Sequence, residues 1–221
     1  MKNKTFFLNN KTIKKIPLKK IIAVTKTLPK EAICLAIKNK IYKIGENKIQ
    51  EAEKKFSNFQ KRNKIELHFI GALQTNKVKK AVSLFDIIQT VDTIKTIDKI
   101  DKEAEKINKK QKIYLQINTS QDPKKRGIKE EDIKVFYNHI KTKKHTTLTG
   151  VMTILKNNLT DKETKYYYQK TKKMQKKIEQ KIKTCKQISM GMSKDFQLAL
   201  EAGATEVRIG TALFGERKTE N

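Results

Sequence analysis

Eight short β-rich segments alternate with segments that carry helical signals, and this alternation constrains the fold more than any other feature. The β-rich segments are Ile21–Thr25, Ile41–Ile44, Leu67–Gly71, Asp86–Val91, Lys112–Asn118, Thr147–Met152, Gln187–Met190 and Glu206–Ile209. Strands that alternate with helices form parallel sheets, and eight strands close a (β/α)8 barrel. We therefore predict an α/β protein with a TIM-barrel fold. The alternative is a doubly wound open sheet, but the Gly-rich first turn typical of that fold does not follow the first segment.

The segments between these runs show the residues that commonly begin and end helices. Ser, Thr, Asp and Asn favour the first position of a helix, and Gly favours the position just after its end. These signals predict helices over Glu31–Lys38 after Pro29, from an Asn47–Gln50 capping box to about Phe59, over Thr93–Ile107 capped by Asp92, from Thr160 to about Lys183, and over Lys194–Ala202 between Ser193 and Gly203.

The chain has 221 residues, which suits one sizeable domain. We predict a single domain over residues 1–221, with its core at about 21–215 and a short Lys-rich segment at 1–20. Only two cysteines, Cys34 and Cys185, are present, which excludes a disulfide-rich scaffold and a zinc site made of four cysteines. No apolar run approaches the ~20 residues of a membrane span, and the start of the chain lacks a signal-peptide core. We expect a soluble, cytoplasmic, monomeric protein without membrane contact.

The net charge of +28 comes from 51 Lys and Arg residues against 23 Asp and Glu residues. A charge of this size is common in proteins that bind nucleic acid. However, only four of the basic residues are Arg, the residue that reads bases through its bidentate fork, and the lysines are spread along the whole chain. We interpret the excess as a solvated surface without specific nucleic-acid binding. Non-specific binding to polyanions at low salt remains an alternative function.

Polar residues that could do chemistry follow several of the predicted strands, where a barrel places its active site. Lys26 comes directly after the first strand. A lysine at the end of a buried run is partly desolvated, which lowers its pKa and favours the neutral amine that attacks aldehydes. The alternative is that Lys26 is one more surface lysine.

Small residues follow the seventh and eighth strands, in the two loops that often bind phosphate in barrels. Gly191 and Gly210 allow the backbone to approach a ligand closely, and Ser193 and Thr211 add hydroxyl donors. These residues could also be ordinary loop glycines and helix caps. Together with Lys26, they suit a ligand that carries both an aldehyde and a phosphate, and pyridoxal 5′-phosphate (PLP) is the common cofactor of that description.

Other segments contain candidate functional residues that could equally have a structural role. Asn47 could bind a ligand or cap a helix, and His68 lies inside a strand pattern, where a core histidine is at least as common as a functional one. His139 and His145 lie among lysines, as surface residues do. Three scattered histidines and two distant cysteines do not favour a metal site.

Motifs spread in order over about Ile21 to Gly215 resemble those of the pyridoxal phosphate homeostasis proteins, a family similar to the N-terminal barrel domain of alanine racemase. The matching segments are Ala23–Thr27, Gly45–Asn47 with Gln50 and Glu51, His68–Gly71 with Leu73–Lys77, Gln116–Thr119, Lys125 with Gly127, Gly150–Met152, Ser189–Asp195 and Val207–Gly215.

The resemblance implies a role for each matching residue. Lys26 would hold the cofactor as an internal aldimine, and Arg208 would face the pyridine nitrogen. Asn47 would lie near the ring oxygen and His68 near the ring. The phosphate would be held by four residues of the last two loops: Met192, Ser193, Gly210 and Thr211.

An arginine beside the pyridine nitrogen keeps that nitrogen unprotonated, because two positive charges repel each other. The ring is then a weak acceptor of carbanion charge, and racemisation would also require a second base opposite Lys26. We therefore predict a non-catalytic protein of vitamin B6 homeostasis that binds PLP reversibly and hands it to apo forms of PLP-dependent enzymes. The alternative is a weak PLP-dependent amino-acid racemase.

Overall fold

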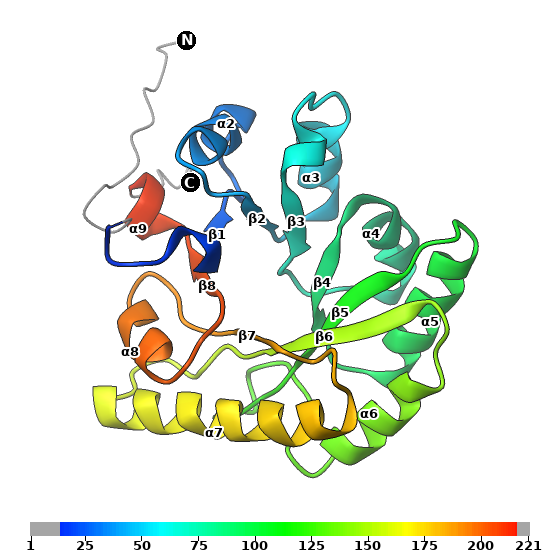
Figure 1. Ribbon diagram of the computed structural model, residues 1–221, viewed down its shortest axis with the longest axis vertical. Helices are drawn as coiled ribbons and strands as arrows, with labels where there is room; N and C mark the ends of the chain where they lie inside the picture. Colours follow the sequence, from blue (N-terminus) through cyan, green and yellow to red (C-terminus); the bar gives the residue numbers. More distant parts are fainter. Residues whose placement is uncertain (1–13, 216–221) are drawn as a thin grey trace.

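The computed structural model describes residues 14–215, which form eight parallel strands surrounded by helices (Figure 1). Most of the Lys-rich segment 1–20 and the last residues of the predicted domain therefore lie outside the described residues. The strands are β1 (Ile21–Val24), β2 (Lys43–Glu46), β3 (Glu66–Phe69), β4 (Ile87–Val91), β5 (Gln111–Gln116), β6 (Thr146–Met152), β7 (Gln187–Ser189) and β8 (Val207–Ile209). Each of the eight predicted β-rich segments contains or overlaps one of them.

The strands follow the order β7-β6-β5-β4-β3-β2-β1-β8, and every pair is parallel. A single parallel bridge between Ser189 of β7 and Glu206, next to β8, closes the circle. Backbone hydrogen bonds support this closure, from Thr205 N and Glu206 N to Ile188 O, both at 3.1 Å, from Met190 N to Glu206 O at 3.1 Å and from Arg208 N to Gly191 O at 3.0 Å. The predicted (β/α)8 TIM barrel is therefore confirmed, and the open doubly wound sheet is excluded.

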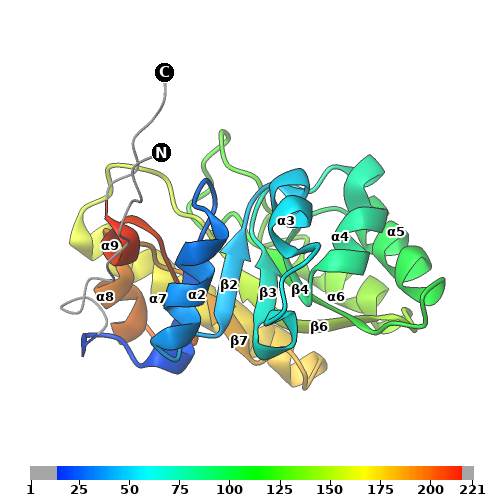
Figure 2. The ribbon, with the colours of Figure 1, turned by 90° about the horizontal axis from the view of Figure 1, so that it is seen from above.

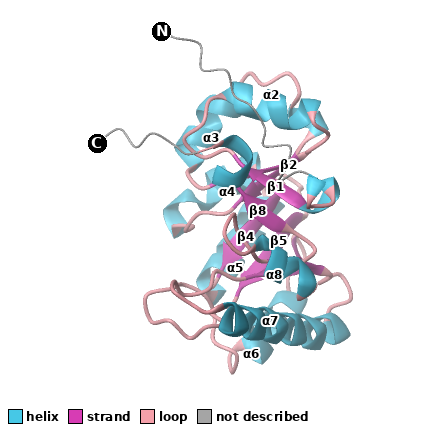
Figure 3. Ribbon diagram, turned by 90° about the vertical axis from the view of Figure 1, so that its left-hand side faces the viewer, coloured by secondary structure: helices cyan, strands magenta, loops and turns pink. Residues whose placement is uncertain are grey.

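The helices cover the outside of the strands. Figure 3 shows the strands grouped at the centre with helices around them, and Figure 2 shows α3, α4 and α5 following one another around the barrel. The helices are α2 (Lys30–Lys38), α3 (Ile49–Phe56), α4 (Val78–Leu84), α5 (Ile94–Glu105), α6 (Ile133–Lys141), α7 (Asp161–Lys181), α8 (Phe196–Glu201) and α9 (Thr211–Phe214), with 3-10 turns η1 (Leu18–Lys20), η2 (Arg62–Lys64) and η3 (Thr75–Lys77).

The predicted start of α7 is confirmed, and the four other predicted starts differ from the structure by one or two residues. Helix α2 begins at Lys30, one residue before the predicted Glu31, with Pro29 at its N-cap. The Thr160 hydroxyl accepts a hydrogen bond from Glu163 N, and the Glu163 carboxylate accepts one from Thr160 N, which makes the capping box of α7. Helices α3, α5 and α8 begin one or more residues later than predicted. Their N-cap positions are occupied by Lys48 for α3, Thr93 for α5 and Asp195 for α8, in place of Asn47, Asp92 and Ser193.

The apolar core lies mainly between the strands and the helices. Ile21, Ala23, Ile44 and Leu67 are fully buried there, and the apolar faces of the helices pack on them. Because successive side chains of a strand point to opposite faces, the residues between these point into the barrel. No helix within residues 14–215 combines the length and the apolar character that a membrane crossing requires.

A titration test arises from Glu103 of α5, which forms ion pairs with Lys99 and Lys106, both at 2.9 Å. Hydrogen bonds from Lys99 and then Lys106 lower the pKa of Glu103 from 4.5 to about 2. A carboxylate with a lowered pKa in the folded state contributes stability above its unfolded pKa, and this contribution is lost as the pH falls toward the folded pKa. The stability difference between wild type and Glu103→Gln should therefore be constant above about pH 5 and shrink toward about pH 2.

Urea unfolding of both proteins across this pH range measures that difference. Glu105→Gln, at an exposed position at the end of the same helix, is the matched control and should follow the wild-type profile. Parallel profiles for wild type and Glu103→Gln would contradict the prediction.

Candidate functional site

A pocket of ≈ 810 Å³ opens where the carboxyl ends of the strands meet. Its walls come from the loops after β1, β2, β3, β6, β7 and β8. Of the eight residues to which the family resemblance gives a role, seven line this one pocket: Lys26, Asn47, Met192, Ser193, Arg208, Gly210 and Thr211. The eighth, His68, does not line it. The barrel thus brings residues from both ends of the described chain to one mouth.

Lys26 follows β1, and its side chain is half-buried at the wall of the pocket. Val24 also lines the pocket, whereas the Thr25 hydroxyl donates a hydrogen bond to Glu46 Oε1 at 2.6 Å. Thr25 N donates to Gly45 O at 3.1 Å and so extends the pairing with β2, and Lys26 then begins a turn that is closed by Leu28 N donating to Thr25 O at 3.0 Å. The Lys26 side chain lies at the pocket, and the Thr25 side chain points away from it.

Arg208 of β8 lines the pocket although only 4% of the residue is exposed. Its Nη1 donates to Ser189 Oγ at 2.8 Å, and its Nη2 donates to Thr153 O at 2.8 Å. Burial lowers the pKa of Arg208, while Tyr168 and the nearby carboxylates oppose this effect. The two hydrogen bonds fix the plane of the guanidinium group at the floor of the pocket.

Below Arg208, a chain of hydrogen bonds crosses the barrel interior. Arg208 can only donate, so Ser189 Oγ accepts from it and gives its own hydrogen to Gln89 Oε1 at 2.7 Å. The Gln89 amide then donates to His68 Nδ1 at 2.8 Å. His68 Nε2 therefore carries a hydrogen, which it donates to Glu66 Oε1 at 3.0 Å. His68 is thus a fully buried residue of the barrel interior whose two ring nitrogens both have partners.

The hydrogen-bond chain that runs from Arg208 to Glu66 also branches to Glu206. Glu206 Oε2 accepts from the Tyr114 hydroxyl at 3.0 Å and from Gln89 Nε2 at 3.4 Å, and its Oε1 pairs with Lys43 Nζ at 2.5 Å. Burial raises the pKa of Tyr114 most, and the charge and the close hydrogen bond of Glu206 raise it further. The polar side chains inside the barrel are therefore connected by hydrogen bonds, and this network ends at the ion pair of Lys43 and Glu206.

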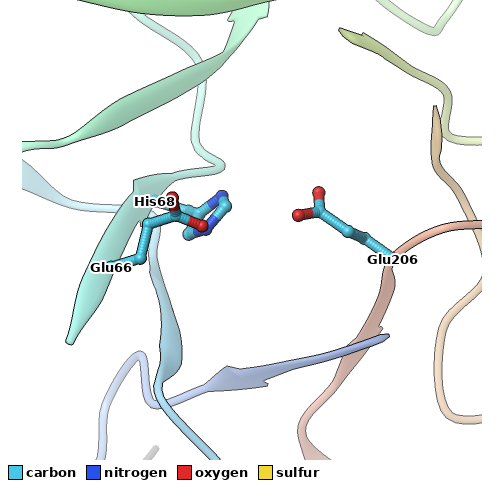
Figure 4. A group of neighbouring side chains, drawn as sticks. All are labelled: Glu66, His68 and Glu206. Carbon is cyan, nitrogen blue, oxygen red and sulfur yellow. The ribbon is translucent and has the colours of Figure 1, made fainter. Parts of the chain in front are cut away.

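Glu66, His68 and Glu206 face one another in this interior, with Glu66 and His68 on β3 and Glu206 across from them (Figure 4). One ligand atom of each lies within 4.8 Å of the others, a spacing compatible with a metal ion. All three side chains already have protein partners, and the Lys43 ammonium pairs with the Glu206 carboxylate. The network is complete with Lys43 as its cation, so this cluster does not require a metal.

The loop after β7 is shaped by a tight turn and by Asp195. Gly191 has a φ of +87°, and a Cβ atom there would lie 2.5 Å from Ala199 Cβ. Asp195 accepts from Met192 N at 2.7 Å through Oδ1 and from the Tyr168 hydroxyl at 2.7 Å through Oδ2. Both carboxylate oxygens therefore have partners.

The Ser193 hydroxyl joins this loop to the next one, because it accepts from Ala212 N at 3.2 Å in the first turn of α9. This contact explains why Ser193 does not cap α8. The loops after β7 and β8 form one continuous wall of small residues, with Ser193, Gly210 and Thr211 all lining the pocket.

Asn47 contributes a polar side chain to the pocket. It lines the pocket, and its Oδ1 atom is buried without a hydrogen-bond partner. Buried polar atoms of native proteins are nearly always satisfied, so an exception in a pocket marks a place for a ligand or water. Asn47 therefore lies in the pocket rather than at the N-cap of α3.

The loops after β2 and β3 approach each other closely beside Asn47. A Cβ atom on Gly71 would lie 2.0 Å from the Asn47 carbonyl oxygen, so only glycine fits there. An amine, a buried guanidinium, an unsatisfied amide oxygen and a wall of small residues together suit a flat ring that carries an aldehyde and a phosphate.

Several contacts of the site were not predicted from the sequence. Gln89 and Ser189 could have been recognised as inward-facing from the period of two along their strands. The contacts of α7 with Asp195, and of α3 with the segment around Lys26, carry no such signal, because nothing local in the sequence relates them.

The family model of the alanine racemase N-terminal domain matches residues 7–218, so the barrel belongs to that family. The alanine racemase of Clostridium difficile 630 has the same fold, with a TM-score of 0.78 at 16% identity over 96% of this chain and 59% of that one. This likeness defines the class of barrel and not its activity.

More specific relatives define the family. The pyridoxal phosphate homeostasis protein of Vibrio alginolyticus is 35% identical over 201 residues, which cover 89% of this chain and 86% of the relative. That of Synechocystis sp. is 36% identical over 202 residues, which cover 91% and 93%. The chain therefore belongs to the family of pyridoxal phosphate homeostasis proteins, which confirms the resemblance seen in the sequence.

Solved structures of a related protein agree with this assignment. PipY of Synechococcus elongatus PCC7942 without PLP superposes with a TM-score of 0.87 at 31% identity, and PipY with PLP bound superposes with 0.85 at 30%. Each comparison covers 93% of this chain and 97% of PipY. The barrel is thus shared with a protein whose structure with PLP bound is known.

Proposed function

We propose that this chain binds PLP in the pocket at the carboxyl ends of its strands and acts in the homeostasis of vitamin B6 within the cytoplasm. The observation that carries the proposal is the meeting of Lys26, Asn47, Arg208 and the small residues of the last two loops in one pocket. The PLP-bound structure of PipY and the names of the relatives support it. The two cysteines, Cys34 and Cys185, are free thiols, as is usual in a reducing compartment.

Each residue has a role in this proposal. Lys26 holds the cofactor covalently through its amine, and Ser193, Gly210 and Thr211 hold the phosphate. Met192 contributes backbone near the phosphate, although its own N–H is already bonded to Asp195. Asn47 lies near the ring oxygen in this proposal, and its side-chain amide N–H group can donate a hydrogen bond to that oxygen.

In this proposal, Arg208 contacts the pyridine nitrogen of the cofactor. The role of His68 depends on its indirect connection to Arg208. His68 reaches the pocket only through Gln89, Ser189 and Arg208. Its contribution is therefore to orient the arginine rather than to contact the ring.

We propose that the chain has no significant turnover. PLP supplies amino-acid chemistry by withdrawing carbanion charge into its ring. Arg208 is held as a hydrogen-bond donor by Ser189 and Thr153, and its positive charge disfavours a protonated pyridine nitrogen. A monomer that binds PLP reversibly in this way can release it to an apo enzyme when a competing amine displaces Lys26.

Borohydride reduction tests the binding proposal, because it fixes the cofactor to the amine that holds it. Peptide mapping of wild-type protein reduced after incubation with PLP should find the label on Lys26. Label spread over surface lysines without saturation at one site would contradict the proposal.

The absence of turnover has a separate test. Amino acids incubated with the PLP-loaded protein in deuterium oxide should show no deuterium at the α-carbon. Incorporation above the rate of free PLP would instead support a weak racemase, which exchanges that proton.

A further inference from the structure

We infer that Glu51 and Lys55 of α3 are positioning residues for Lys26, because they hold the backbone on both sides of it and so direct its amine into the pocket. The inference rests on the proposed function of Lys26 as the PLP anchor. Neither Glu51 nor Lys55 lines the pocket, so they would act through the chain that carries the lysine and not on the ligand.

The contacts run from one helix to the two neighbours of Lys26. Lys55 Nζ donates to the carbonyl oxygen of Thr25, the residue before Lys26, at 2.8 Å. Glu51 Oε1 accepts from the N–H of Thr27, the residue after Lys26, at 2.5 Å. Lys55 and Glu51 also pair with each other at 2.6 Å, four residues apart on α3. One ion pair therefore holds both peptide groups that flank Lys26.

Thr27 shows that this backbone needs to be held. Its φ of +61° lies in the left-handed region, which a β-branched residue rarely adopts. Such a conformation persists only where surrounding contacts stabilise it. The bonds from Thr27 N to Glu51 and from Leu28 N to Thr25 O at 3.0 Å are contacts of this kind, and together they keep the chain turned sharply just after Lys26.

Glu46 of β2 makes the arrangement more rigid. This fully buried residue accepts from Thr25 Oγ1 at 2.6 Å and from Lys55 Nζ at 2.8 Å through the same oxygen, Oε1. Its other oxygen, Oε2, is buried without a partner. Lys55 is therefore the cation that compensates a buried carboxylate, which places its ammonium in one fixed position.

These contacts lie on the outer side of the barrel wall, between β1, β2 and α3. The Thr25 side chain and the backbone groups of Thr25 and Thr27 are held there, while the side chain of Lys26, at the start of the turn between them, lies at the pocket. A lysine side chain is long and flexible, and fixing the start of the chain reduces the positions that its amine can occupy. Attack on an aldehyde requires close approach in a defined direction, and an error of about 1 Å can cost a factor of about 100 in rate.

The experiment compares the rate at which PLP is captured covalently by wild type and by variants of the ion pair. The rate is followed by the visible absorption of the lysine adduct, and borohydride mapping identifies the residue labelled. Lys55→Met and Glu51→Ala should capture PLP at least about tenfold more slowly than wild type. Glu51→Gln keeps an oxygen that can accept from Thr27 N, so it should recover much of the rate lost in Glu51→Ala.

Two substitutions on the same helix are the matched controls. Lys54→Met removes an exposed lysine, and Glu53→Ala removes the carboxylate that pairs with Lys80 on the surface at 3.0 Å. Each makes the same change of charge as its counterpart, and neither lies among the contacts that hold Thr25 and Thr27. Both should capture PLP at the wild-type rate.

A second measurement separates positioning from a general loss of structure. Deoxypyridoxine 5′-phosphate has a methyl group in place of the aldehyde, so its affinity reports the pocket without the lysine adduct. Calorimetry should give wild-type affinity for all the variants. Variants that lose this affinity as strongly as they lose capture would overturn the inference, because the pocket itself would then have collapsed.

The outcomes distinguish this inference from the proposed function. If the wild-type protein captures no PLP on Lys26, the proposed function itself is wrong. Wild type that captures it while Lys55→Met and Glu51→Ala capture it equally fast would overturn the positioning role alone. If Lys55→Met does not fold, Glu51→Ala and Glu51→Gln decide the question by themselves, since the Glu51 side chain is partly exposed.

Discussion

Lys26→Ala should abolish the covalent capture of PLP while the folded barrel is retained. Lys26 is half-buried at the pocket wall and is not part of the interior network around Glu206, so its removal leaves that network intact. The amine that attacks the aldehyde is lost, and no visible absorption of a lysine adduct should form on addition of PLP. Mass spectrometry after borohydride reduction should find no specific label.

The matched control for this prediction is Lys38→Ala, an exposed lysine in the last turn of α2. It removes the same charge from the same βα unit and should give the wild-type absorption and label. Saturable labelling of Lys26→Ala to one equivalent at another lysine would contradict the assignment of Lys26 as the anchor.

Glu206→Ala should be among the most destabilising single substitutions in the barrel. The change removes the shared acceptor of Tyr114, Gln89 and Lys43 at the centre of the strands. Tyr114 and Gln89 are fully buried and have no access to bulk water as a replacement. Leaving buried donors and a charge without their partner costs about 3–5 kcal/mol, and the partial exposure of Lys43 favours the lower end.

Urea unfolding measures this loss directly. Glu201→Ala is the matched control, because Glu201 pairs at 3.1 Å with Lys165 on the surface, where both side chains are largely exposed. Both substitutions remove one negative charge, so the difference between them reports burial rather than overall repulsion. The control should lose less than about 1 kcal/mol, and an equally small loss for Glu206→Ala would contradict the described network.

The main features of the fold could be predicted because parallel barrel strands are buried on both faces and appear as short apolar runs. Ile21–Val24 is an example, since all four residues are buried. Helices were harder to predict where their apolar stripe is short. Helix α4 buries only Val78, Ala81 and Val82 beside two lysines, and no helix was predicted there.

The pocket residues could be predicted for a different reason. A closed barrel gathers the carboxyl ends of all its strands at one mouth, so position after a strand was enough to bring Lys26 together with Ser193 and Thr211. His68 shows the limit of that reasoning. It matched a family motif, but its position within β3 and not after it puts the ring inside the barrel.

The contacts that support the site could not be predicted, because they join side chains far apart in the sequence. Ser189 and Gln89 are 100 residues apart, and Lys55 reaches a backbone oxygen 30 residues away. A strand pattern shows which face a side chain occupies, but the identity of its partner depends on the register and tilt of the neighbouring strands.

The single bridge between Ser189 and Glu206 means that fewer residues are paired at the junction of β7 and β8 than between any other two neighbouring strands of the barrel. A ligand that contacts Lys26 after β1 and the loops after β7 and β8 would connect the two sides of this junction. Ligand occupancy and resistance to opening of the barrel would then be thermodynamically linked. At a hundredfold excess over Kd, the bound ligand would add about 2.7 kcal/mol to the free energy of unfolding, so the vitamer would act as a structural part of the wall that stores it.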